Sequence, residues 1–263
     1  MKFGGTSVGT SQRIKNVSKK IIKATKSETK VLVVVSAMAG YTDKLISKTK
    51  EFNNCEFNPE FDSVLSSGEQ LSSGLLSMYL NNQKIKSRSI MGWQIPIETD
   101  SNFGKARIKK INNKNLVKLF KDFKVLVVAG FQGVDRLGRI TTLGRGGSDT
   151  TAVALAASIK AEICEIYTDV EGIYTADPRD VINAKKINNM TYEETLELSS
   201  LGSKVLHPRS VELAMKYDIK VHVRSSFSNK KGTLVLKEGK KLEKELVTGI
   251  TSSDDEAKIT LIG

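Results

Sequence analysis

The sequence has few of the residues that build disulfide networks or metal centres, and no stretch that would span a membrane. Its two cysteines, Cys55 and Cys164, form no Cys-x-x-Cys pair, and its only histidines are His207 and His222. A disulfide framework and a histidine-rich metal site are therefore excluded, and we expect a reduced, cytoplasmic setting without protein metal ligands. No apolar run approaches the ~18 residues of a membrane span, and the N-terminus lacks a signal-peptide core. We therefore expect no membrane partner.

Acidic residues are also under-represented, since 41 lysines and arginines against 29 aspartates and glutamates give a formal net charge of +12. This excess is compatible with nucleic-acid binding or with a lysine-rich solvated surface that attracts acidic small molecules. The N-terminal lysines are scattered and are not interleaved with aromatic residues. This pattern favours the solvated surface, and we expect no nucleic-acid partner.

The 263 residues are enough for one large domain or two moderate ones. Continuous β-branched runs at Val31–Val35 and Val125–Ala129 predict strands buried on both faces, which is typical of a parallel sheet. A further strand is expected at Glu165–Thr168. Helical patterns alternate with the strands, so the sequence predicts an α/β three-layer α/β/α sandwich with a mainly parallel central sheet.

Several helices can be bounded from local signals. Ile14, Val17 and Ile21 share one face of a first helix. Longer apolar patterns predict helices at 61–80 and 150–159. Thr191 and Glu194 form a capping box for a helix through Leu198, and Pro208 suits the first turn of a helix through Tyr217. His207 is expected to cap that last helix rather than act as a base. Residues 135–139 predict a hairpin turn, which we place near the passage between two lobes.

Both ends of the sequence suggest incomplete units. Only Met1, Lys2 and Phe3 precede the first glycine turn, too few for a full buried strand. Near the other end, 246–250 and 258–262 predict strands that begin a unit which the chain does not complete.

Two glycine-rich turns are the most informative feature. One runs from Gly4 to Gly9 directly after Lys2, and the other spans Gly144–Thr150 before an apolar helical pattern. Glycines allow backbone N–H groups to approach a ligand closely, and a helix N-terminus adds partial positive charge. The first turn is not a Walker A loop, since Thr10 and Ser11 follow its last glycine and the lysine lies upstream. Two such turns and a lysine predict a polyanion site.

Six segments in order resemble the aspartokinase branch of the amino-acid kinase family. They are Lys2–Ser7, Ser36–Ala37 with Thr42, Ser67–Glu69, Gly144–Asp149, Thr168–Arg179 and Lys204–Arg209. The resemblance implies the amino-acid kinase fold, with a catalytic domain over 1–245 that has an amino-acid-binding lobe at about 1–133 and an ATP-binding lobe at 134–245. Residues 246–263 resemble the start of a regulatory ACT region.

The resemblance implies ATP-dependent phosphorylation of the side-chain carboxylate of L-aspartate to 4-phospho-L-aspartate, with Mg²⁺. That reaction is the first step toward lysine, threonine, methionine and diaminopimelate, and a homo-oligomer is expected for the full-length form. The chemistry is consistent, because a carboxylate is already ionised at neutral pH and needs no general base. The enzyme must instead align two anions and neutralise the moving phosphoryl group.

The site residues follow from the resemblance. Lys2 would stabilise the transferring phosphoryl group, and Asp149 would orient Lys2 or position the substrate. Arg145 would hold the α-carboxylate of aspartate and Glu69 its ammonium group, while Thr42 and Ser148 add hydroxyl hydrogen bonds. The residues expected to contact ATP are Lys2, Gly4, Gly5, Ser7, Thr168, Asp169, Tyr174, Arg179, Lys204 and Val205.

Simpler roles remain open for several of these residues. Ser7 would cap a helix, Glu69 and Lys204 would lie at the surface, and Asp149 would be a helix N-terminal charge. Two other functions also remain open. One is an acetylglutamate or uridylate kinase of the same fold, against which Glu69 and Arg145 argue. The other is a non-catalytic regulatory or nucleic-acid-binding protein, against which Lys2, Asp149 and Lys204 argue.

Overall fold

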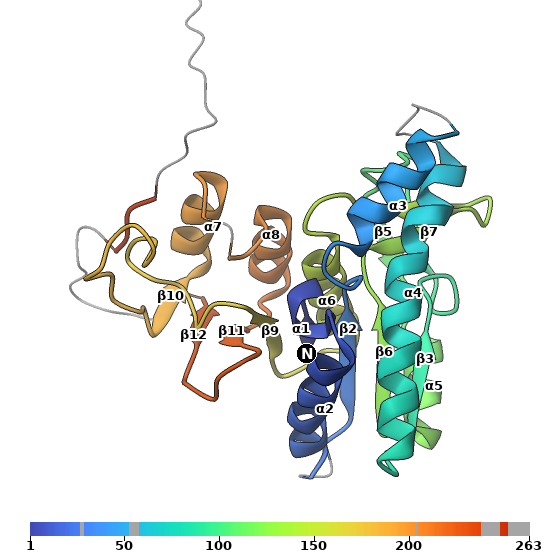
Figure 1. Cartoon of the computed structure of the whole chain (residues 1–263), viewed down its shortest axis with the longest axis horizontal. Coiled ribbons are helices and arrows are strands. Elements are labelled where there is room, and N and C mark those ends of the chain that lie inside the picture. Colours follow the sequence, from blue (N-terminus) through green and yellow to red (C-terminus); the bar gives the residue numbers. More distant parts are fainter. Residues whose placement is uncertain (27–28, 53–57, 204, 238–247, 252–263) are drawn as a thin grey trace, which may run out of the picture.

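The computed structural model describes residues 1–26, 29–52, 58–203, 205–237 and 248–251. Helices cover both faces of a large, mainly parallel sheet (Figure 1). The predicted three-layer α/β arrangement is therefore confirmed.

Within the described residues the large sheet has eight strands in the order β10-β12-β11-β9-β1-β2-β6-β3. Neighbouring strands are parallel, apart from the antiparallel pair β11 and β12. The strands are β1 (Lys2–Phe3), β2 (Val31–Val35), β3 (Ser87–Ile90), β6 (Val125–Ala129), β9 (Cys164–Thr168), β10 (Asn189–Thr191), β11 (Val221–Ser225) and β12 (Thr233–Leu236).

Strand β1 is short but central. Its two residues pair with β2 on one side and β9 on the other, so that Lys2 lies opposite Val34 and Ile166. The chain leaves β1 toward β2 and later returns to β9 on the opposite side, so the strand order reverses at β1. Open α/β sheets bind ligands at the carboxyl ends of strands where the order reverses. Lys2 and the first glycine turn therefore lie where this topology favours a ligand.

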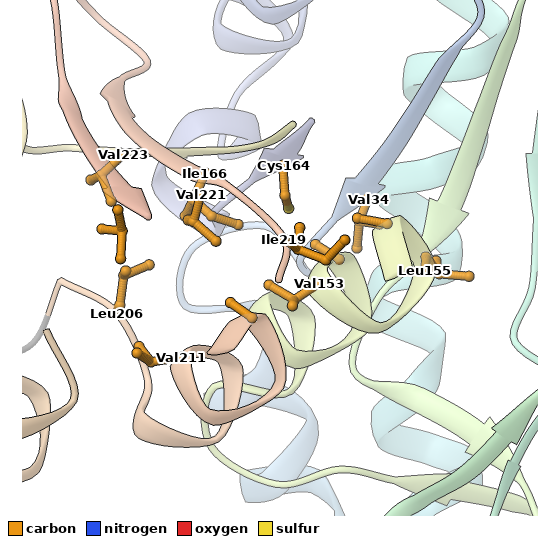
Figure 2. Packing of buried hydrophobic residues seen from close by; sticks show 14 of the residues in the cluster. Val34, Val153, Leu155, Cys164, Ile166, Leu206, Val211, Ile219, Val221 and Val223 are labelled. Atoms are coloured by element: carbon orange, nitrogen blue, oxygen red, sulfur yellow. The ribbon is translucent and has the colours of Figure 1, made fainter. Parts of the chain in front are cut away.

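The two faces of the sheet are covered by different helices, because side chains alternate along each strand. Val33 and Val35 pack in one cluster with residues of α1 (Gly5–Val8), α2 (Ser11–Thr25) and α4 (Pro59–Asn82). Val34 packs on the other face with α5 (Lys114–Asp122), α6 (Gly147–Ser158) and α8 (Pro208–Tyr217). Figure 2 shows this second cluster, where Val153 and Leu155 of α6 approach the strands. Helix α3 (Tyr41–Lys50) lies against α4, and α7 (Tyr192–Ser200) against α8.

A second, four-stranded sheet in the order β5-β4-β7-β8 was not foreseen from the sequence. It consists of β4 (Ile97–Thr99), β5 (Ile108–Ile111), β7 (Gln132–Val134) and β8 (Ile140–Thr142). Strands β7 and β8 are antiparallel, which confirms the hairpin at 135–139. Asp135 stabilises that turn by accepting hydrogen bonds from the Leu137 and Arg139 N–H groups at 2.9 and 3.0 Å. The lobe boundary near residue 133 stays a prediction.

The helix signals were accurate to a few residues. Helix α8 begins at Pro208 and ends at Tyr217 as expected, with His207 as its N-cap. Helix α7 begins after Thr191, whose capping box with Glu194 is present. Helix α6 begins at Gly147, earlier than the expected Thr150, so the last part of the second glycine turn is the first turn of the helix.

The strands expected at 246–250 and 258–262 lie mostly outside the described residues. Residues 248–251 are described and contain no strand, and the rest of 246–263 lies outside the described residues. Among the described helices, none combines the length and the apolar character that a membrane crossing requires.

Candidate active site

A cavity of about 390 Å³ lies at the carboxyl ends of β1, β2 and β6. Seven of the predicted site residues line it, although they come from distant parts of the sequence. They are Lys2, Gly5, Thr42, Glu69, Arg145, Ser148 and Asp149. The other lining residues are 36–40, Asp43, Phe131, Gly144, Gly146 and Gly147. The fold thus joins both glycine turns, the loop after β2 and the middle of α4 around one space.

Lys2 and Asp149 form an ion pair at the centre of this site. Their Nζ and Oδ1 atoms are 2.6 Å apart, and the side chains are only 11% and 13% exposed. Oδ1 of Asp149 is buried and accepts no directed hydrogen bond from the described residues, so the contact is electrostatic rather than a well-angled hydrogen bond. A charge pair with so little water around it interacts strongly with any charge that enters the cavity. Asp149 therefore holds the ammonium group of Lys2 in place at the wall of the cavity.

Glu69 is a second buried charge, projecting from the middle of α4. Its Oε1 accepts a hydrogen bond of 2.9 Å from the Ala37 N–H, while its buried Oε2 has no hydrogen-bond partner among the described residues. Burial raises the pKa of this carboxyl to about 7, despite the opposing backbone hydrogen bonds. A buried acceptor without a donor is costly in a folded protein. The structure therefore leaves room at Oε2 for a donor from a ligand.

The second glycine turn presents side chains of different character. Gly144 and Gly146 adopt positive φ values of 74° and 68°, a conformation that favours glycine. Arg145 between them is exposed, whereas Ser148 is buried in the first turn of α6. The N-terminal end of α6 thus faces the cavity with its partial positive charge.

The first glycine turn packs tightly against the loop after β2. A Cβ on Gly5 would lie 2.6 Å from the Ala37 carbonyl oxygen, so this position requires glycine. Gly4 does not line the cavity, and its N–H donates to the Tyr167 carbonyl at 3.3 Å. Ser7 is also buried away from the cavity, with its Oγ 2.5 Å from Oγ of Ser226. Of these three predicted ATP contacts, only Gly5 borders the cavity.

The expected ATP contacts on and after β9 that the structure describes lie outside the cavity lining. Thr168 ends β9, and its hydroxyl donates to Asp169 Oδ1 at 3.0 Å. The Tyr174 hydroxyl donates to Glu171 Oε2 at 3.5 Å.

Arg179 and Val205 are two further residues expected to contact ATP. The Arg179 guanidinium is 2.6 Å from Asp177 Oδ2, and its hydrogen bonds lower the pKa of Asp177 to about 2. Val205 is partly buried against the core cluster. Lys204 lies outside the described residues.

Two residues of this region were missed by sequence reasoning. Phe131 lines the cavity with a positive φ of 65°, which no sequence signal of a phenylalanine indicates. Asp62, in the first turn of α4, is fully buried, and burial raises its pKa. Its sequence position suggests only a charge that favours the helix N-terminus.

Metal ligation by the protein alone finds no support in the part of the chain that the structure describes. No group of three or more His, Cys, Asp or Glu side chains there could hold an ion.

Comparison with known proteins places this site in a family context. The chain is 47% identical over 262 residues to an aspartokinase of Geobacillus stearothermophilus, an alignment that covers the whole chain and 64% of that relative. The chain thus spans about two thirds of the length of the curated relatives it matches.

Solved structures of aspartate kinases are also similar to this chain. The aspartate kinase of Synechocystis is 46% identical, with a TM-score of 0.79 over 90% of this chain and 39% of that one. Aspartokinase III of E. coli in complex with aspartate and ADP is 28% identical, with a TM-score of 0.81 over 91% and 64% of the two chains. The model of the amino acid kinase family matches residues 1–225. Because this match covers most of the sequence, the chain belongs to the amino acid kinase family.

Proposed function

We propose that this protein transfers the γ-phosphoryl group of ATP to the side-chain carboxylate of L-aspartate. One observation carries the proposal, namely a single cavity lined by a buried lysine, a buried glutamate and an arginine. The similarity to aspartokinases along the whole chain supports it, as does the E. coli structure that contains aspartate and ADP. The product would be 4-phospho-L-aspartate.

The charges of the cavity suit a free amino acid rather than an acylated one or a nucleotide. A free amino acid carries an ammonium group, for which Glu69 offers a buried oxygen without a donor. It also carries an α-carboxylate, which the planar guanidinium of Arg145 can hold with two parallel hydrogen bonds. Acetylglutamate and UMP lack the ammonium group, so Glu69 would remain a buried acceptor without a partner. Thr42 and Ser148, which also line the cavity, would add hydroxyl contacts.

The transfer itself requires charge stabilisation more than proton movement. The attacking carboxylate is already ionised at neutral pH, so its oxygen attacks the γ-phosphorus while the bond to the bridging oxygen of ADP breaks. Lys2 would neutralise charge on the phosphoryl group in transit, and Asp149, 2.6 Å away, would hold its ammonium in position.

A magnesium ion would arrive with the nucleotide and supply further neutralisation of the phosphate charge. Mg²⁺ is commonly held by one or two carboxylates together with phosphate oxygens. Asp149 lines the cavity, but its Oδ1 already pairs with Lys2 Nζ at 2.6 Å, so phosphate oxygens would have to supply most of the ligands. The other carboxylate that we assign to the nucleotide side is Asp169.

The nucleotide would lie along the end of β9 and the segment after it. Gly5 would approach the phosphates from the cavity, and Arg179 would approach them from the exposed segment. Thr168, Tyr174 and Val205 would contact the ribose and base. Gly4 and Ser7 would act mainly by holding the first turn, since both already make internal hydrogen bonds. Lys204 remains part of the proposal on the resemblance alone.

The test is acyl-phosphate trapping. The chain is incubated with ATP, Mg²⁺, hydroxylamine and either L-aspartate, N-acetylglutamate or UMP, and hydroxamate and ADP are measured. We expect hydroxamate only with aspartate, in a one-to-one ratio with ADP. Turnover of acetylglutamate or UMP with none of aspartate would overturn the proposal.

A further inference from the structure

Arg209, in the first turn of α8, contacts the site without lining it. Its Nη1 donates to the Leu143 carbonyl at 2.5 Å, and its Nη2 donates to the Ala106 carbonyl at 3.0 Å. One guanidinium therefore joins two backbone segments that are distant in the sequence.

Asp62 holds the same two segments through their donors. Its carboxylate accepts hydrogen bonds from the Thr142 N–H and hydroxyl at 2.6 and 2.8 Å, and from the Gly104 N–H at 3.0 Å. The segments are also joined to each other, since the Ala106 N–H donates to the Thr142 carbonyl at 2.9 Å. An acidic side chain thus binds the N–H groups of the pair, and a basic one binds its carbonyl groups.

One of the segments that Arg209 holds leads directly into the second glycine turn, which carries Arg145. Leu143 precedes Gly144 and Arg145. A second contact comes from the same helix end, because a Cβ on Gly146 would lie 2.2 Å from Cγ of His207. The N-terminus of α8 therefore touches the turn on both sides of Arg145.

We propose that Arg209 is a positioning residue that fixes the turn carrying Arg145 and couples nucleotide binding to aspartate binding. The coupling follows from chain connectivity, since Val205, which we assign to the nucleotide, lies two residues before the N-cap His207. A displacement of this segment by a bound nucleotide would be passed to Leu143 through the Arg209 contact. The inference rests on the proposed function for the identity of both ligands, but not for the geometry of the contact.

The guanidinium is suited to this task because its planar fork reaches two carbonyl groups at once. Lysine presents a single ammonium on a flexible stem and would keep one of the two contacts at a time. Methionine would fill a similar volume and keep neither. Comparing the two substitutions thus distinguishes the effect of side-chain packing from the effect of the two hydrogen bonds.

The experiment compares Arg209→Met, Arg209→Lys and the control Arg88→Met. Arg88 lies over the Phe123 ring, 5.9 Å from its centroid, and does not line the cavity. Aspartate affinity is measured by calorimetry with and without saturating ADP, and KM and kcat are measured with the hydroxamate assay. In the ligand-free proteins, amide exchange is followed over residues 142–147.

For Arg209→Met we expect a rise of roughly 10-fold in Kd and KM for aspartate, because two hydrogen bonds from a charged donor are lost. The change in kcat should be smaller, and the effect of ADP on aspartate affinity should disappear. Arg209→Lys should lie between wild type and Arg209→Met, and Arg88→Met should match wild type. Exchange over 142–147 should be fastest in Arg209→Met, intermediate in Arg209→Lys and unchanged in Arg88→Met.

Two results would overturn the inference. One is a folded Arg209→Met variant with wild-type aspartate affinity, and the other is a wild-type affinity that ADP does not change. If wild type neither binds nor phosphorylates aspartate, the proposed function fails instead, and the exchange data still decide whether Arg209 holds the turn.

Discussion

Two ion pairs, one at the cavity and one on the segment after β9, differ in their contact with water. Around the cavity, Lys2 and Asp149 are 11% and 13% exposed, and Glu69 is buried. On the nucleotide side, the Arg179 and Asp177 side chains are 82% and 36% exposed.

The difference indicates a preformed amino-acid site beside an open nucleotide segment. Desolvated charges interact strongly with a ligand, whereas exposed pairs contribute little because water and salt screen them. Substitutions around the cavity should therefore have larger effects than chemically similar substitutions on the segment after β9.

The largest expected effect is that of Lys2→Met. Loss of one strong electrostatic donor in the transition state should lower kcat by roughly 10²–10³ and change KM for ATP much less. The measurement is steady-state ADP release with aspartate. Lys15→Met, on the exposed face of α2, is the control and should retain wild-type kcat. If kcat were unchanged in a folded Lys2→Met protein, the buried pair would have no part in the transfer.

Glu69 should give the cavity side a pH dependence that the exposed side lacks. The ammonium group of aspartate needs the ionised carboxylate, whose pKa in the free protein is about 7. Between pH 8 and pH 6 the carboxyl becomes protonated, so KM for aspartate should rise roughly 10-fold. Steady-state kinetics across this range would measure it. Glu69→Gln should have a higher KM at pH 8 and no such pH dependence.

The same group predicts the sign of a stability change. Burial raises the pKa of Glu69 from 4.5 to about 7, so between these values the unfolded chain binds fewer protons than the folded one. The free energy of unfolding should therefore fall as pH rises through this window, by on the order of 3 kcal/mol in total. Urea unfolding at pH 5 and pH 7.5 would measure it, with Glu69→Gln as the control. A contribution of opposite sign would mean that a cation stabilises the carboxylate.

Elements of the fold that depend on local sequence signals could be predicted, whereas those that depend on contacts between distant segments could not. Strands β2 and β6 were predicted because runs of β-branched residues indicate burial on both faces, and α8 because Pro208 marks its start. In the small sheet only the β7–β8 hairpin was predicted, and the rest was missed, since β4 has only three residues, too few for a period. Tertiary contacts, rather than local preference, make them strands.

The candidate site was likewise predicted only where local sequence signals reveal it. The glycine turns and their neighbouring charges can be seen in the sequence, and the fold brings seven of the predicted residues around one cavity. The positive φ of Phe131 and the burial of Asp62 cannot be seen, because each results from contacts between segments far apart.

A smaller effect is expected for Arg179→Ala, which tests the exposed side. Its pair with Asp177 is largely solvated, so the loss should raise KM for ATP less than about 10-fold and leave KM for aspartate unchanged. Initial rates at varied ATP and at varied aspartate would separate the two. A larger change for aspartate than for ATP would place Arg179 with the cavity instead.

The most direct test of the preformed amino-acid site is the thermal shift that L-aspartate produces without nucleotide. In wild type we expect a saturable rise in Tm, because a ligand that binds only the folded state stabilises it. The rise should be lost in Arg145→Ala and kept in Arg179→Ala. A rise that survives in Arg145→Ala, or that is lost in Arg179→Ala, would contradict the assignment of aspartate to the cavity.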